Sequence, residues 1–421
     1  MAAISTAVAA ATLAIVAQDA TTLRAAPRDA AAAHAQLVAG DALEVRSERG
    51  DYLQVYDHRR ERAGYVRATQ VRTLALTPAE APALAAVMRF LKDAPGQETL
   101  AIAYSAAYLR AAPREAIDGA AFDVLGTAAE RLAQRASDTA RLSKAQETKL
   151  NAEVEAAAAY GVRMTSIERD GRIRLCYDGE AFRRVLALPA TTEARARAAL
   201  ALTDPECIDP AMLPAARREL DDWRNDTLAK VDVATPTAPL GAPTDVLQNT
   251  LRQRVQMRRA AVWSAIAFHR VRESGDSAST SKAQAAAQEA ARIFASIDRA
   301  ALDDRDQVAY ADAAIRVSAV RPLIDVVPVK TVAGKALAKL VAHPGEPGQT
   351  CLSLHAADGK PTARRCTWGI AYVDAANVNA SGDTITLPVQ PLDGWRELWV
   401  WRKRDGEWSV TALPPGTSTG V

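Results

Sequence analysis

The sequence predicts a multidomain α+β protein, in which a strand-rich segment, a long helical region and a second strand-rich segment follow one another. Apolar residues alternate with a period of two over 21–74, recur three and four positions apart over 77–161, and alternate again over 323–414. Turn pairs such as Asp405-Gly406 separate the short runs of the last segment. The 421 residues are long enough for two or three domains.

The composition narrows the class of protein. Hydrophobic residues make up 49% and charged residues 24% of the chain, which is typical of a globular protein and argues against a disordered one. The 52 Lys and Arg against 50 Asp and Glu leave a net charge of +2, so no strong field favours a nucleic-acid partner. Beyond residue 20, no apolar run is long enough to span a bilayer.

The first 17 residues, MAAISTAVAAATLAIVA, have the character of a secretory signal. They are apolar, rich in small residues and uncharged, and the first basic residue is Arg24. An apolar stretch followed by small residues up to Ala17 is typical of the core and cleavage site of such a segment. The alternative is an ordinary alanine-rich helix. We expect a signal-like segment over 1–17.

The cysteines also indicate a protein that is exported from the cytoplasm. The four cysteines fall in two local groups, Cys176 with Cys207 and Cys351 with Cys366. Four cysteines allow three connectivities, and proximity along the chain favours one disulfide within each group. Disulfides require an oxidising compartment, so we expect a periplasmic or secreted protein. Four reduced thiols are the alternative, and the spacing does not suit a zinc site.

Residues 18–75 carry a series of glycine, aromatic and valine positions in short strands. The positions are Leu23, Arg24, Pro27, Gly40, Gly50, Asp51, Tyr52, Val55, Gly64, Tyr65, Val66 and Val71. In these positions the segment resembles the bacterial SH3 family. The resemblance implies a small β-barrel that binds peptidoglycan stem peptide or an envelope protein. Tyr52 and Tyr65 are the candidate ligand groove, and the alternative is that both rings close the small core.

Residues 76–321 are predicted to form a helical domain. Thr77 followed by Pro78 and Glu80 is typical of a helix start, and Gly161 of a helix end. Within this domain Asp170-Gly171 lies between two alternating segments and predicts a β-hairpin over 162–178. A proline-rich linker is expected at 234–244.

Residues 322–415 are predicted to form an antiparallel β-sandwich or barrel, followed by a disordered tail at 416–421. Trp399 and Trp401 share one strand face, which Trp395 extends. An antiparallel sheet buries one face, so these rings are expected in the core. If that face is exposed instead, the three tryptophans form a partner surface.

The sequence contains no recognisable catalytic motif. His-Glu-x-x-His, Gly-x-Ser-x-Gly and phosphate-binding glycine loops are all missing from the 421 residues. Cys176 with His269 does not have the setting of a cysteine peptidase, and a disulfide explains Cys176 better. A carboxylate pair such as Asp178 and Glu180 is the alternative for glycan cleavage. We predict no catalytic residue, no metal and no cofactor.

These observations favour an exported cell-envelope protein without a catalytic centre. The SH3-like segment would bind peptidoglycan peptide or an envelope protein, and the helices would act as a scaffold. One alternative is a cell-wall hydrolase that uses carboxylates of the helical domain. Another is a docking protein in which the SH3-like segment packs only against its own helices.

Overall fold

The structure is a computed structural model that describes most of the chain. The described residues are 12–138, 142–169, 171–231, 249–273, 277–320, 326–330, 336–344, 349–356, 361–367, 370–374, 377–391 and 396–414. Three sequence predictions fall outside these ranges, namely the linker at 234–244, the tail at 416–421 and the position of Trp395.

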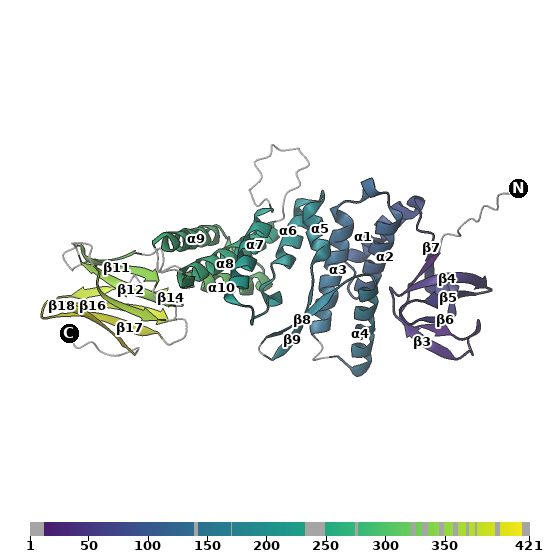
Figure 1. The fold of residues 1–421 in the computed structure, drawn as a ribbon, viewed down its shortest axis with the longest axis horizontal. Coiled ribbons are helices and arrows are strands. Elements are labelled where there is room, and N and C mark those ends of the chain that lie inside the picture. Colours follow the sequence, from purple (N-terminus) through teal and green to yellow (C-terminus); the bar gives the residue numbers. More distant parts are fainter. Residues whose placement is uncertain are drawn as a thin grey trace. The chain divides into compact units, whose positions relative to one another are not determined.

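The chain divides into two compact units, residues 1–212 and 213–421. The first contains an antiparallel sheet and helices, and the second contains helices and two further antiparallel sheets (Figure 1). The predicted mixed α/β chain, with sheets at both ends and helices between them, is confirmed. The boundary at Met212 lies inside the predicted helical domain 76–321, and helical periodicity on both sides of it gave no sign of a break.

Seven strands form the N-terminal sheet. They are β1 (Leu13–Val16), β2 (Thr21–Arg24), β3 (Ala33–Leu37), β4 (Ala42–Arg49), β5 (Tyr52–Asp57), β6 (Arg62–Arg67) and β7 (Val71–Leu74). The strand order is β3-β2-β6-β5-β4-β1-β7, and all the pairs are antiparallel. The inner face buries small aliphatic side chains, among them Leu23, Leu53, Val55 and Val66. Among the described strands no pairing joins β3 to β7, so the expected small barrel is an open sheet in its hydrogen bonding.

The strand β1 corrects the predicted boundary at residue 17. Leu13–Val16 pairs with β4 on one side and β7 on the other, and Ala14, Ile15 and Val16 are fully buried. The apolar run that suggested the end of a signal-like segment is therefore a strand inside the sheet, because both kinds of segment need consecutive apolar residues. Cleavage after Ala17 would remove this strand, so the sheet begins at Leu13 instead of residue 18.

Six helices and one strand pair complete the first unit. The helices are α1 (Ala81–Lys92), α2 (Glu98–Ala111), α3 (Gly119–Ser137), α4 (Lys144–Ala159), α5 (Glu180–Ala187) and α6 (Thr192–Leu202). The strands β8 (Met164–Arg169) and β9 (Arg172–Tyr177) pair antiparallel between α4 and α5 in the sequence. Asp118, Ser143 and Thr191 cap α3, α4 and α6 with their side chains, as their residue types favour.

The helices cover one part of the outer face of the N-terminal sheet. Ile15 of β1 and Leu74 of β7 belong to the same buried cluster as Met88 of α1 and Ile102 of α2. The loop after β3 takes part as well, because the Tyr160 hydroxyl donates to the Gly40 carbonyl over 2.6 Å. The β1–β7 side of the sheet is therefore fixed to the helices.

Among its described residues the second unit begins with four helices, α7 (Pro214–Ala229), α8 (Asn249–Glu273), α9 (Ser277–Ala295) and α10 (Asp304–Val320). Its strands are β10 (Val326–Lys330), β11 (Ala336–Pro344), β12 (Thr350–Ala356), β13 (Pro361–Thr367), β14 (Ile370–Val373), β15 (Asn379–Ser381), β16 (Thr384–Pro391), β17 (Glu397–Arg404) and β18 (Glu407–Leu413). β10-β11-β12-β13 form one sheet, and β14-β16-β17-β18 with β15 form another. Residues of both sheets share one buried core, and the two sheets lie face to face in Figure 1.

Candidate functional site

The strands β5 and β6 present one aliphatic face and one aromatic face. Leu53 and Val55 of β5 and Val66 of β6 point into the sheet's core. Because side chains alternate along a strand, Tyr52, Tyr56 and Tyr65 lie on the opposite face. We call the outer face that carries Tyr52, Tyr56, Tyr65, Arg24, Arg46 and Arg67 the tyrosine face.

Tyr52 is the most buried member, with 6% of its surface exposed. Its hydroxyl donates to Asp29 Oδ1 over 2.5 Å, and the Arg67 guanidinium lies 5.4 Å from its ring centroid. Arg67 also binds Asp29, through Nε at 3.0 Å and through a second guanidinium nitrogen. The bonds from Arg67 and Tyr52 hold the pKa of Asp29 below its ordinary value, and the same bond to Asp29 raises the pKa of Tyr52. Tyr52 therefore anchors the loop that carries Asp29 and is not itself an open contact surface.

Tyr56 is the member that the sequence analysis missed. The guanidinium of Arg46 lies 5.7 Å from the centroid of the half-buried Tyr56 ring, and the imidazole of His58 lies 4.8 Å from it in an edge-on arrangement. Glu44 accepts from both neighbours, from Arg46 at 3.0 Å and from His58 at 2.6 Å. The sequence pattern could have revealed Tyr56, because Tyr52, Gln54 and Tyr56 alternate with the aliphatic residues of β5.

Tyr65 lies in the middle of the tyrosine face and is half-buried. It pairs across the strands with Gln54 of β5 and with Arg24 of β2. The Arg24 guanidinium donates to the carbonyls of Asp29 and Ala31, so it orders the same loop that Tyr52 anchors. The two predicted ligand residues, Tyr52 and Tyr65, therefore share a face, with Tyr65 as the more accessible ring.

The tyrosine face is basic. Arg24, Arg46, Arg49 and Arg67 lie on it or at its edge, and their carboxylate partners there are Glu44 and Asp29. The arginines lie beside or over tyrosine rings, an arrangement that suits planar and anionic groups. Arg46 and Arg67 bind Glu44 and Asp29, and Arg24 binds loop carbonyls. The face therefore combines partly exposed tyrosine rings with guanidinium groups that are held in place.

The tryptophans of strand β17 are buried, unlike Tyr56 and Tyr65. Trp399 and Trp401 are fully buried, with their centroids 6.2 Å apart, and they pack with Leu340, Leu352 and Leu354 of the opposite sheet. The condition for a partner surface, an exposed face, is not met by these two residues. They are core residues because the β11–β12 sheet covers the face of β17 on which they lie.

Both predicted disulfides are present. Cys176 bonds Cys207, which ties β9 to the short helical turn Pro205–Cys207, and Cys351 bonds Cys366 across the paired strands β12 and β13. No free cysteine remains. The disulfides are compatible with an extracellular or periplasmic protein.

The carboxylates considered for catalysis have structural partners. Asp178 binds Arg163 over 3.2 Å and accepts from the Glu180 amide, while Glu180 binds Arg184 of its own helix over 3.0 Å.

His269 lies 3.2 Å from the buried Asp221, beside a cavity of about 210 Å³ between α7 and α8. Within the described residues no three His, Cys, Asp or Glu side chains gather as metal ligands. None of the described helices is both long and apolar enough to traverse a membrane.

Comparisons with protein-family models, with curated proteins and with solved structures found no match for this chain.

Proposed function

We propose that the chain is an exported cell-envelope protein whose N-terminal, SH3-like sheet binds peptidoglycan stem peptide at the tyrosine face. The observation that carries the proposal is the division of the sheet's outer side. The β1–β7 part is buried against helices, whereas Tyr56 and Tyr65 remain partly exposed beside arginines. The docking of the sheet onto its helices therefore does not use the aromatic residues, which leaves them for a ligand.

The chemistry of a stem peptide suits this face. Such a peptide is short and carries free carboxylates, which arginine guanidinium groups bind well. Tyr56 and Tyr65 offer amphipathic ring surface with little side-chain entropy to lose. The Tyr52–Asp29–Arg67 cluster holds the loop beside the face in one arrangement, so less ordering is needed on binding.

The proposal is tested with the full chain, by pull-down on purified peptidoglycan and by calorimetric titration with a soluble stem tetrapeptide. The variant Tyr56→Ala/Tyr65→Ala is expected to bind at least about tenfold more weakly, since each ring supplies contact area and a hydroxyl. Phe90→Ala, at a ring that is 79% exposed on α1, is the matched control and should bind as the parent does. Equal binding by the tyrosine variant, or no binding by the parent chain, would contradict the proposal.

A second candidate function is the wall hydrolase that uses Glu180 and Asp178. A peptidoglycan zymogram separates the two functions, because clearing by the parent protein that disappears in Glu180→Gln would favour hydrolysis. The salt bridges of both carboxylates explain their positions without a reaction, so the binding function is preferred.

A further inference from the structure

The strand β8 has an edge whose backbone groups face away from its only pairing partner among the described strands, β9. The Asp178 amide donates to the Arg163 carbonyl over 2.9 Å. This bond identifies the residues of β8 whose backbone N–H and C=O groups point toward β9. Since hydrogen-bonded and non-bonded positions alternate in an antiparallel pair, Thr165 and Ile167 bond to β9. Ser166 and Glu168 therefore direct their N–H and C=O groups outward.

The outer edge of β9 is covered at Leu175, and this difference singles out β8. Leu175 lies opposite Ser166 and donates its amide to Ser137 Oγ of α3 over 2.8 Å. The edge of β8 borders instead a groove of about 520 Å³, whose other wall is Asp209, Pro210 and Ala211. An open strand edge beside a groove is the geometry that accepts an added strand.

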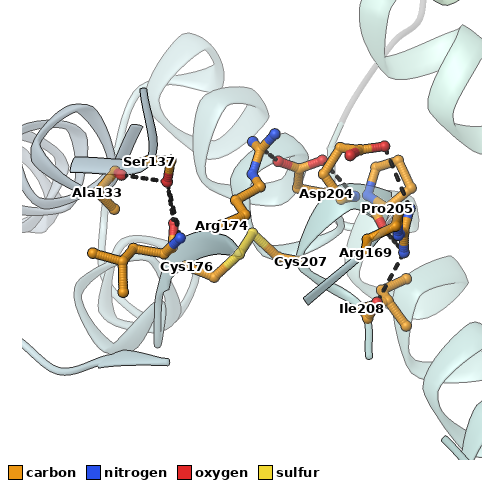
Figure 2. Close-up of a disulfide and its surroundings, with 11 residues drawn as sticks. Ala133, Ser137, Arg169, Arg174, Cys176, Asp204, Pro205, Cys207 and Ile208 are labelled. Atoms are coloured by element: carbon orange, nitrogen blue, oxygen red, sulfur yellow. Dashed lines mark hydrogen bonds and ion pairs between the residues drawn. A yellow bond between two sulfur atoms is a disulfide. The ribbon is translucent and has the colours of Figure 1, made fainter. Parts of the chain in front are cut away.

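A disulfide holds the far wall of the groove in place (Figure 2). Cys207 bonds Cys176 of β9, and next to this bond Arg174 binds Asp204 over 2.9 Å. Arg169 donates to the carbonyls of Pro205 and Ile208 over 3.1 and 2.9 Å. The segment that leads into the wall is therefore fixed to the β8–β9 pair by three contacts, and the groove is formed before any partner arrives.

The charges around the groove select the partner. Glu168 and Asp209 line it and are exposed, whereas the guanidinium of Arg169, the basic group among the lining residues, is directed to the carbonyls just described and to Glu206. Glu168 alternates with Ile167 and Arg169, so its side chain lies on the face opposite the segment that carries Asp209. A strand with basic side chains would meet one carboxylate on either face, and an acidic strand would be repelled.

We infer that the β8 edge binds an extended, basic peptide segment as a third strand, through backbone hydrogen bonds to Ser166 and Glu168. This site is separate from the tyrosine face and does not depend on the proposed function. Main-chain bonds would supply affinity, and Glu168 and Asp209 would supply the preference for Lys or Arg.

The test uses the full, oxidised chain and two synthetic peptides of about seven residues, one alternating Lys with Val and Thr, the other with Glu in place of Lys. Fluorescence anisotropy is expected to show binding of the Lys peptide and at least about tenfold weaker binding of the Glu peptide. Ser166→Pro removes one outward N–H without removing a bond to β9, and should weaken binding of the Lys peptide about tenfold. Ser166→Ala keeps the N–H and should bind as the parent does.

Amide hydrogen exchange of the parent chain provides a measurement that needs no variant. Addition of the Lys peptide should slow exchange at Ser166 and Glu168, and leave Thr165 and Ile167 unchanged because β9 already protects them. The inference is overturned if the Lys peptide does not bind, if the Glu peptide binds equally well, or if this alternation of protection is missing. Sedimentation that shows a dimer abolished by Ser166→Pro would also overturn it, since the occupant would then be a second copy of the chain.

Discussion

The strands β5 and β17 carry aromatic residues in the same two-residue phase, yet Tyr56 of β5 stays half-buried outside the core whereas both tryptophans of β17 are fully buried. On β17 the rings of Trp399 and Trp401 fill the core between two sheets. On β5 the core face is aliphatic, and Tyr52 and Tyr56 lie on the face that points away from it. The difference teaches that an aromatic stripe stays accessible only where no second layer covers it and the opposite face already fills the core.

The largest expected effect is on the free energy of unfolding when one aromatic ring is removed from either strand region. Trp401→Ala should lower the free energy of unfolding by about 3–5 kcal/mol, because the side chain is fully buried. Tyr65→Ala, on the half-buried face, should cost less than about 1 kcal/mol. Urea unfolding followed by circular dichroism measures both values. Similar losses for the two variants would show that the tyrosine face is part of a core.

The two disulfides differ in the length of chain that they close. Cys176 and Cys207 are separated by 31 residues, and Cys351 and Cys366 by 15. Replacing both cysteines of a pair by alanine should cost roughly 4 kcal/mol for the first and roughly 3 kcal/mol for the second, as unfolded-chain entropy predicts. Denaturation of the two double variants tests this order. A larger loss for the 351–366 pair would contradict the entropic explanation.

A substitution at Gly40 should disrupt the contact between the N-terminal sheet and the helices. A Cβ there would lie 2.7 Å from the Thr99 carbonyl oxygen, and the backbone φ of +96° already disfavours a side chain. Gly40→Ala should therefore cost about 2 kcal/mol or more.

The matched control for Gly40 is Gly50→Ala, at φ +62° with open space around it. It should cost only about 1 kcal/mol, because backbone strain acts there without a clash. Thermal unfolding of both variants checks the difference. Equal losses would mean that the contact with α2 is not tight.

The smallest expected effect is a pH dependence of the loop beside the tyrosine face. Arg67 and Tyr52 lower the pKa of Asp29 from its ordinary value of 3.8, so the folded state favours the carboxylate. This stabilisation is present above the ordinary value and is lost as the pH falls through the lowered pKa. NMR shifts of the Tyr52 ring should follow that titration, and Asp29→Asn should abolish the response. A response centred above 3.8 would contradict the assignment.

The sequence predicted the order of sheets and helices and both disulfide pairings, because periodicity, turn pairs and cysteine proximity are local signals. It predicted the wrong start for the first sheet, since the apolar run of Leu13–Val16 has the same composition in a buried strand and in a signal segment. Alternation alone could not predict that Trp401 is buried while Tyr56 stays partly exposed. The strands β11 and β12 cover Trp401, whereas the helices leave Tyr56 partly exposed. Both outcomes depend on contacts between residues that are far apart in the sequence.

The most direct test of the central claim uses 3-fluorotyrosine in place of the nine tyrosines, with ¹⁹F NMR of the full chain during addition of stem tetrapeptide. The resonances of Tyr56 and Tyr65 are expected to shift in a saturable manner, while those of the buried Tyr104 and Tyr108 among the helices stay unchanged. Single Tyr→Phe variants assign the signals. Unchanged Tyr56 and Tyr65 resonances at saturating peptide, or shifts confined to the other tyrosines, would contradict the account.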